Sequence, residues 1–244
     1  KVIRFSDGAS SVQAPESLPE DFNWAVVTVK NEPVDSYYTL IRQTYSILAK
    51  YSLYAKLTLN LPYLPYARAD RAFGKNYGNP LEIFVSQLGN IDFDNIVLTD
   101  VHNEKVTTEL FSMYTSALLG FNSRLDCFRN TVNRERKLKE LLKKDPVFCA
   151  PDSGAAASTC EIAEYYGGEY ILCEKTRNPH NGYITGLEIV FGTNVDGRTV
   201  IITDDICDGG ATFDISARAL KEAGAKEVIL YVTHGIFSKG IESL

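Results

Sequence analysis

The residues best suited to chemistry lie together in the segment 200–212. Four β-branched residues, 200–203, precede two adjacent carboxylates, Asp204 and Asp205, and a turn of small residues follows and ends at Thr212. Two neighbouring carboxylates can accept hydrogen bonds from two neighbouring sugar hydroxyls. Backbone N–H groups of a small-residue turn, together with a helix N-terminus, bind phosphate. The segment therefore predicts a sugar-phosphate site.

The phosphate-binding part of this segment is expected at its end. Glycine lets the backbone come close to a phosphate, and a hydroxyl adds a donor. An acidic pair that merely leads into a helix is the simpler explanation for carboxylates alone, but the strand before and the turn after favour a ligand site. The expected phosphate contacts are Asp208, Gly209, Gly210, Ala211 and Thr212.

Two cations, Lys175 and Arg177, follow another apolar run. Alternate residues of a strand project to the same side, so both can face one ligand. There they can meet the charge that builds on a transferring phosphoryl group. Taken alone, the pair would be explained equally well as surface charge.

Three more polar segments follow apolar runs. Arg68 and Asp70 lie in a proline-containing segment, His102 follows an aspartate, and Asp152 precedes Gly154. A proline-rich turn, a structural histidine and a helix-capping aspartate would explain them singly. Their shared place after strands favours ligand binding, because ligands of α/β proteins bind at the carboxyl ends of strands.

The elements that must position these residues follow an alternating pattern. Short β-branched runs alternate with segments of helical periodicity, which predicts the α/β class with mainly parallel sheets flanked by helices. Strands are expected at 24–29, 57–61, 96–99, 147–150, 170–173, 187–191, 200–203 and 228–232.

Helix ends are predicted from capping residues. Asp35 is expected to cap a helix with one apolar face, and Asn79 to begin another that Gly89 ends. A third helix, with a basic solvated face rather than a nucleic-acid patch, is expected from Asn133. Weak periodicity over 118–130 places a junction there, which gives two domains, 1–120 and 121–244.

The composition is that of an ordinary globular chain. Of 244 residues, 45% are hydrophobic and 23% charged. No apolar run approaches the roughly 20 residues of a membrane span. A net charge of −6 gives no general footprint for nucleic acid, and the five cysteines match no zinc pattern. We expect reduced thiols in a cytoplasmic protein with neither membrane nor nucleic-acid partners.

Several of these segments resemble one family. The segment 204–212 resembles the ribose-phosphate loop of type I phosphoribosyltransferases and of their relatives, the ribose-phosphate diphosphokinases (phosphoribosyl pyrophosphate synthetases). Only the second family accounts for PYLPYARADR at 62–71, which resembles its PYARxD motif. DVHNEK at 100–105, PDSG at 151–154 and KTR at 175–177 resemble its DLH, SPDxGGAK and K-x-R elements. The resemblance implies two phosphoribosyltransferase-like domains.

The resemblance also implies residue roles. Lys175 and Arg177 would be the catalytic pair, and Asp204 and Asp205 would hold the ribose hydroxyls beside the phosphate loop. On the nucleotide side, FSDG at 5–8 resembles the motif with which a neighbouring subunit holds adenine. The implied ATP-binding residues are Phe5, Asp7, Arg68, Asp70 and His102, and the residues near Mg²⁺ are His102 and Asp152.

The sequence departs from the family pattern at several positions. Ala9 replaces an acidic residue, and Ala211 replaces the glycine before the closing threonine. The family's basic residue after the PDSG segment is not preserved, because Ala157 and Ser158 occupy its place. Acidic residues of the family are absent where Phe111 and Thr115 stand. The family's N-terminal strand–helix unit and C-terminal segment are unmatched, so we expect a divergent and shortened member.

The implied activity is transfer of the β,γ-diphosphate of ATP to the C1 hydroxyl of ribose 5-phosphate, with Mg²⁺, in a homo-oligomer that is a hexamer or dimer. Two alternatives stay open. A type I phosphoribosyltransferase would use only the C-terminal site, against which segment 62–71 argues. A non-catalytic regulatory subunit is favoured by the alanine departures, whereas Lys175 and Arg177 favour catalysis.

A Lys175→Ala variant tests the role of the cation pair. Losing one donor that stabilises the transition state typically costs about 10²- to 10³-fold in rate. We expect the variant to bind ribose 5-phosphate and ATP normally while losing turnover by that factor, as measured by steady-state kinetics and calorimetry. Near-normal turnover would contradict the assigned role.

Overall fold

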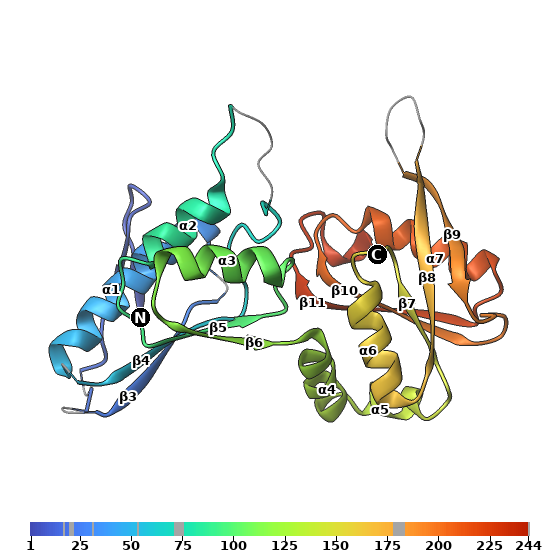
Figure 1. The fold of residues 1–244 in the computed structure, drawn as a ribbon, viewed down its shortest axis with the longest axis horizontal. Coiled ribbons are helices and arrows are strands. Elements are labelled where there is room, and N and C mark those ends of the chain that lie inside the picture. The colour runs from blue at the N-terminus through green and yellow to red at the C-terminus, as the bar shows by residue number, and fades with distance from the viewer. Residues whose placement is uncertain are drawn as a thin grey trace. The chain divides into compact units, whose positions relative to one another are not determined.

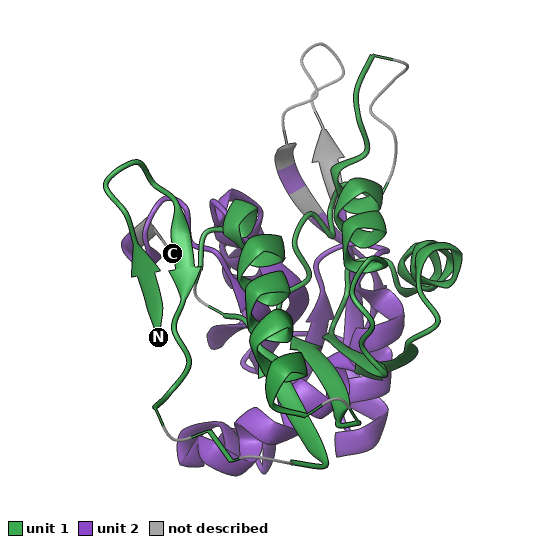
Figure 2. Ribbon diagram, turned by 90° about the vertical axis from the view of Figure 1, so that its left-hand side faces the viewer, with its two compact units in different colours: residues 1–122 green, residues 123–244 purple. Residues whose placement is uncertain are grey.

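The computed structural model describes all residues except 17, 20–21, 31, 53, 71–75, 178–183 and 244, and omits several side chains of the strands at 169–177 and 184–192. The chain forms two compact units, Lys1–Asn122 and Ser123–Leu244 (Figure 2). The predicted boundary between 120 and 121 lies two residues before the division between these units.

The first unit contains a parallel sheet of four strands in the order β3-β4-β5-β6 (Figure 1). Its strands are β3 (Trp24–Thr28), β4 (Lys56–Leu61), β5 (Asn95–Thr99) and β6 (Leu118–Asn122). Its helices are the 3₁₀ turn η1 (Val34–Ser36), α1 (Tyr37–Tyr51), α2 (Pro80–Leu88) and α3 (Glu104–Tyr114). An antiparallel hairpin of β1 (Val2–Arg4) and β2 (Ser10–Val12) precedes them.

One face of this sheet supplies most of the first core. Leu57, Leu59 and Leu61 alternate along β4 and are buried, while Thr58 and Asn60 between them are only half-buried. The buried leucines pack with apolar residues of α1 and α2. The period of two therefore separates a core face from a more accessible face.

The predicted ends of α2 are confirmed. The Asn79 side chain accepts a hydrogen bond from the Glu82 N–H at 3.2 Å, with Pro80 at the first helical position. Gly89 ends the helix, and a Cβ at this position would lie 2.1 Å from the Tyr114 carbonyl oxygen. Only glycine therefore fits between α2 and the end of α3.

The predicted cap of α1 is wrong. Asp35 lies inside η1, and the N-cap of α1 is Ser36, which forms no side-chain capping bond. The Asp35 carboxylate instead accepts a hydrogen bond from the Tyr66 hydroxyl at 2.5 Å. A contact with a residue 31 positions away has replaced the local cap.

The second unit contains five strands in the order β11-β10-β7-β8-β9. Only β9 is antiparallel to its neighbour, so the sheet is mainly parallel. Its strands are β7 (Val147–Ala150), β8 (Glu169–Arg177), β9 (Ile184–Gly192), β10 (Thr199–Cys207) and β11 (Glu227–Gly235). Its helices are α4 (Arg124–Arg134), α5 (Arg136–Leu142), α6 (Ala156–Tyr166), α7 (Ala211–Glu222) and the 3₁₀ turn η2 (Ile241–Ser243).

The segment predicted as a junction is regular structure. Residues 118–130 contain β6 and most of α4, and the helix expected from Asn133 is divided between α4 and α5. Ser123 and Asp126 form a capping box that begins α4. This S-x-x-D pattern marks the start of the helix, which the weak periodicity of the segment did not indicate.

Helices cover both faces of the second sheet. Val200 and Ile202 of β10 pack in a cluster with Phe213 and Leu220 of α7. Ile201, between them, packs in a second cluster with Phe128 of α4 and Ile162 of α6. Burial on both faces explains the uninterrupted apolar run of β10.

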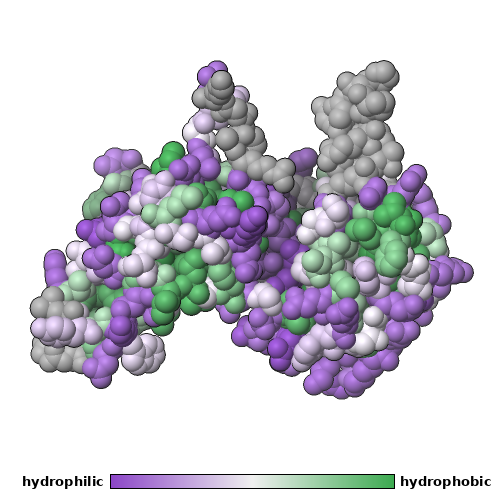
Figure 3. Space-filling model, in the orientation of Figure 1, coloured by the Kyte–Doolittle hydropathy of each residue, from purple (hydrophilic) through white to green (hydrophobic). Residues whose placement is uncertain are grey.

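The surface is predominantly polar on the side shown in Figure 3, where hydrophilic residues surround smaller apolar areas in each unit. Among the described residues, no helix combines the length and the apolar character needed to cross a bilayer.

A Phe128→Ala variant tests the aromatic core of the second unit. Phe128 is fully buried and makes edge contacts with the rings of Phe148, Tyr166 and Tyr231. We expect its removal to lower the free energy of unfolding by about 3–5 kcal/mol, the usual result for a buried phenylalanine, in urea denaturation. The control Tyr54→Ala removes a ring that is 95% exposed and should change little. Equal effects of the two variants would contradict this core assignment.

Candidate active site

The carboxylates Asp204 and Asp205 lie at the carboxyl end of a buried central strand. β10 is paired with β7 on one side and β11 on the other, and residues 200–203 are buried. The Asp204 side chain is 17% exposed, and Asp205 is 6% exposed. The Asp205 N–H donates to Asp204 Oδ1 at 2.9 Å. Two successive residues of the strand therefore carry carboxylates with little access to water.

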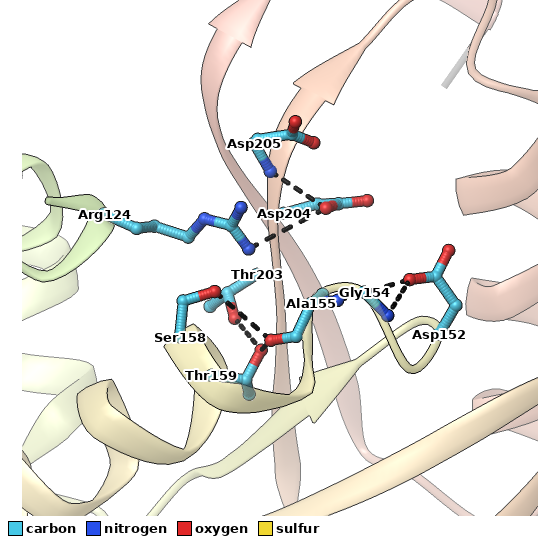
Figure 4. A network of polar contacts seen from close by, with 9 residues as sticks. All are labelled: Arg124, Asp152, Gly154, Ala155, Ser158, Thr159, Thr203, Asp204 and Asp205. Atoms are coloured by element: carbon cyan, nitrogen blue, oxygen red, sulfur yellow. Dashed lines mark hydrogen bonds and ion pairs between the residues drawn. The ribbon is translucent and has the colours of Figure 1, made fainter. Parts of the chain in front are cut away.

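A buried arginine faces this pair. Figure 4 shows Arg124 extending from the start of α4 toward Asp204. The Arg124 side chain is 7% exposed, and its Nη1 lies 3.8 Å from Asp204 Oδ1, within ion-pair range but longer than a hydrogen bond. Nothing in the sequence around Arg124 distinguishes it from a surface arginine, so the prediction missed it.

The pKa of Asp204 is raised from 3.8 to about 7. Burial is the largest cause, followed by the charge of Asp205, while Arg124 opposes the rise and Asp152 adds to it. Desolvation and like charges both favour the protonated form of a carboxyl group. Asp204 is thus near its titration midpoint at neutral pH, and an added cation would favour its charged form.

Asp152 lies in the turn between β7 and α6. Its Oδ1 accepts hydrogen bonds from the N–H groups of Gly154 at 3.0 Å and Ala155 at 3.3 Å. One of its oxygens therefore closes the turn before α6, but Asp152 is not the N-cap, which is Ala155 and has no side-chain capping bond. A buried hydrogen bond of 2.8 Å between the hydroxyls of Thr159 and Thr203 ties α6 to the end of β10 (Figure 4).

The turn after β10 leads directly into α7. Gly210 is the N-cap of this helix and has φ +76°, in the left-handed region that favours glycine. No side chain caps the helix. Because α7 begins at Ala211, the N–H groups of Ala211 and Thr212 belong to its first turn, where they have no intrahelical acceptor. The predicted phosphate contacts thus lie at a helix N-terminus.

The cation pair is described only in its backbone. Lys175 and Arg177 lie in β8, with register irregularities at Leu172/Cys173 and Thr176/Arg177, and their side chains lie outside the described residues. β8 runs parallel to β7, and Leu172 pairs with Ala150 just before the Asp152 turn. The backbone of Lys175 and Arg177 therefore lies beyond the carboxyl end of β7, at the sheet edge where the Asp152 turn begins.

In the first unit, two loops that carry predicted ATP contacts are joined. Asp70 accepts a hydrogen bond of 2.8 Å from the Asn103 side-chain amide. The side-chain oxygen of Asn103, Oδ1, also caps α3 by accepting a hydrogen bond from the Val106 N–H at 3.1 Å. The loop after β4 and the loop after β5 thus lie together at one sheet edge, with Arg68 and His102 exposed on them.

Both loops contain unusual backbone conformations. Tyr66 has φ +62° and Asp100 has φ +38°, which are uncommon for residues other than glycine. The hydrogen bond to Asp35, together with burial, raises the pKa of Tyr66 to about 12. Strained backbone of this kind concentrates at ligand sites. Asn103 and Asp35 were both missed as supports of these loops.

The remaining predicted contacts lie on the β1–β2 hairpin. Phe5 is 54% exposed, which leaves its ring accessible for stacking. The Asp7 carboxylate accepts a hydrogen bond of 3.0 Å from the Ala9 N–H and so closes the turn. Gln43 of α1 bonds both Ser10 and Val12, which anchors the hairpin to the first unit.

The chemistry of the donors suits magnesium. Asp152, Asp204 and Asp205 offer hard oxygen atoms, and the pKa of Asp204 is raised by burial and, after that, by the charge of Asp205. In the described part of the chain, no group of three or more His, Cys, Asp or Glu side chains forms a ready metal cluster. Mg²⁺ is often held by one or two carboxylates plus substrate phosphates, so the set fits a shared ion.

Comparisons with known proteins decide the family. The family described as phosphoribosyl transferase domain matches residues 135–242. The chain is 31% identical over 189 residues to the ribose-phosphate pyrophosphokinase of Pyrococcus abyssi, covering 77% of this chain and 60% of that protein. It is 27% identical over 239 residues to that of Vibrio cholerae, covering 97% and 71%. The chain belongs to the ribose-phosphate pyrophosphokinase family.

The fold agrees with this family. The crystal structure of phosphoribosylpyrophosphate synthetase from Mycobacterium smegmatis matches with a TM-score of 0.71 at 24% identity, covering 97% of this chain and 72% of that one. The predicted α/β class with two phosphoribosyltransferase-like domains is thereby confirmed. This pyrophosphokinase family member spans about 60% of the length of its Pyrococcus relatives.

An Asp204→Asn variant tests the raised pKa. A carboxyl group whose folded pKa lies above its unfolded value stabilises the fold fully below the unfolded pKa, and this contribution is lost as pH rises through the folded pKa. For Asp204 the loss falls between about pH 4 and pH 7. We expect the free energy of unfolding to fall less over this range in the variant than in the wild type.

Urea denaturation at pH 4.5 and pH 7.5 measures this difference. The matched control is Asp214→Asn, which removes an exposed carboxylate of α7 that pairs with Arg218. The assignment fails if Asp204→Asn and wild type lose the same stability between the two pH values.

Proposed function

We propose that this chain is a ribose-phosphate diphosphokinase that transfers the β,γ-diphosphate of ATP to the C1 hydroxyl of ribose 5-phosphate, giving phosphoribosyl diphosphate and AMP. One observation carries the proposal: two shielded carboxylates lie in the last part of a central strand, shortly before a glycine turn and an uncapped helix N-terminus. This arrangement, in a chain of this family, suits a ribose diol and its 5-phosphate at once.

The sugar phosphate is proposed to bind in the second unit. The carboxylates of Asp204 and Asp205 accept hydrogen bonds from the ribose hydroxyls, and the guanidinium of Arg124 forms an ion pair with the Asp204 carboxylate. The 5-phosphate is received by the turn 208–212 and by the N-terminus of α7, whose partial positive charge favours an anion. The hydroxyl of Thr212 adds a donor.

ATP is proposed to bind residues of the first unit. Arg68, Asp70 and His102 lie on the joined loops after β4 and β5, which supports a common role toward the nucleotide phosphates. The exposed Phe5 ring stacks on adenine, with Asp7 holding the turn beside it. By resemblance to the family, this hairpin serves the ATP site of a neighbouring subunit in a homo-oligomer.

The chemical step is proposed to depend on positioning and charge. The C1 hydroxyl oxygen attacks the β-phosphorus, the bond to the α-phosphate oxygen breaks, AMP leaves, and the hydroxyl proton passes to solvent. Phosphoryl transfer asks little covalent help from side chains. Lys175 and Arg177 meet the charge that develops on the transferring group.

Magnesium is the proposed cofactor. When bound, Mg²⁺ would neutralise phosphate charge. Asp152 and His102 are the residues that we propose near the ion. We further propose a cytoplasmic protein without nucleic-acid or membrane partners, in keeping with five free cysteines.

Phosphorus NMR of the chain with ATP, Mg²⁺ and ribose 5-phosphate tests the activity. We expect AMP and phosphoribosyl diphosphate to form in equal amounts. A chain that binds both substrates without turnover would indicate a regulatory subunit, and consumption of phosphoribosyl diphosphate with a nucleobase would indicate a phosphoribosyltransferase. Either result contradicts the proposal.

An Asp205→Asn variant tests the diol contact in the same system. A hydrogen bond to a charged group contributes about 1.5–3 kcal/mol, so we expect ribose 5-phosphate to bind about 10- to 100-fold more weakly by calorimetric titration. Affinity for ATP should not change, and Glu222→Gln, which removes an exposed carboxylate at the other end of α7, serves as the control. Unchanged ribose 5-phosphate affinity would exclude the contact.

A further inference from the structure

The turn 208–212, which is proposed to receive the phosphate, lies among negatively charged side chains that disfavour an anionic ligand. The strand end and turn contain three aspartates, Asp204, Asp205 and Asp208, and no lysine or arginine lies between Arg198 and Arg218. Helix N-termini and backbone N–H groups supply only partial positive charge. A full cation from another part of the chain would add to this partial charge in binding a sugar phosphate that carries close to two negative charges.

The segment after β11 is attached to this turn. The N–H groups of Ile236 and Phe237 donate to the Cys207 carbonyl oxygen at 2.8 and 3.2 Å, and the Ser238 N–H donates to that of Asp208 at 3.2 Å. The Gly240 N–H donates to the Phe237 carbonyl oxygen at 2.8 Å, and Phe237 has φ +48°. A second tight turn thus lies directly beside the first.

Lys239 in this second turn lies against the first. A Cβ placed on Gly209 would be 3.4 Å from Lys239 Cε, 3.5 Å from Cδ and 3.8 Å from Cγ. The aliphatic stem of the lysine therefore runs along Gly209, and the ammonium is one bond beyond Cε. Lys239 is exposed, and no described carboxylate forms an ion pair with it.

We propose that Lys239 is a phosphate-binding residue, which places its ammonium on the 5-phosphate seated by the turn 208–212. This inference rests on the proposed function, because it names a further residue of the same sugar-phosphate site. The charged group comes from an element 30 residues beyond the turn in sequence.

The contact between Lys239 and Gly209 has a physical advantage over a cation within the turn 208–212. A lysine stem packed on Gly209 is already ordered, so less side-chain entropy is lost when the ammonium binds phosphate. The ammonium also offsets the repulsion between the phosphate and Asp208. Lys239 therefore adds specificity for a phosphorylated sugar over the free sugar.

Calorimetric titration of the full chain with ribose 5-phosphate tests the inference. We expect Lys239→Met to weaken binding about 10- to 100-fold, since a charge-assisted hydrogen bond is lost. Lys239→Arg should restore most of the affinity, and ATP affinity should be unchanged in both. Wild-type binding should weaken as salt is raised, and Lys239→Met should reduce that dependence.

Lys137→Met is the matched control, because it removes an exposed lysine of α5, near the start of β10. Thermal unfolding should be the same for all variants. If wild type binds ribose 5-phosphate and Lys239→Met binds it equally well, the inference is wrong while the proposed function stands. If wild type does not bind the sugar phosphate, both are overturned.

Discussion

The position of the candidate site depends on the pairing of β10 with strands on both sides. β7 and β11 satisfy its backbone while helices cover both faces, so that residues 200–203 lie fully inside the second unit. Pairing with β7 ends at Ile202, whereas β10 continues beside β11 to Cys207. Two carboxylates are consequently held in the last part of the strand, shortly before the turn that is proposed to bind phosphate.

Charge is distributed unevenly around this strand end. Asp204 is buried beside Asp205, and a buried guanidinium only partly compensates the pair. The turn that follows adds the carboxylate of Asp208, whereas Lys239, which is proposed to offset it, lies in the turn after β11. The side chains of the site thus carry more negative than positive charge. The arrangement suits a ligand that is anionic at its phosphate and is accompanied by a cation.

Residue patterns predicted the strands well because their physical causes are local. β-branched runs identified the central strands of both units, and Asn79 and Gly89 marked the ends of α2. The same local reasoning placed Asp204 and Asp205 after a strand that ends at 203, whereas β10 extends to Cys207 and includes both. It failed for Asp35, whose carboxylate is used by a tyrosine of another loop. The junction expected within 118–130 contains the division between the units, although its residues form β6 and the start of α4.

The supports of the site could not be predicted in this way. Arg124 reaches Asp204 across 80 positions of sequence, Asn103 joins Asp70 across 33, and Lys239 lies on Gly209 across 30. Such contacts depend on how the sheets assemble, and no periodicity or spacing records them. The roles of Lys175 and Arg177 remain predictions, since only their backbone is described.

The raised pKa of Asp204 has a thermodynamic consequence. Burial favours the protonated form of this carboxyl group, whereas a bound cation would favour the charged form and expel the proton. Ligand uptake would then release protons into the medium, and the apparent heat of association would vary with the ionisation enthalpy of the buffer. The second unit would thereby couple substrate capture to the acidity of its surroundings.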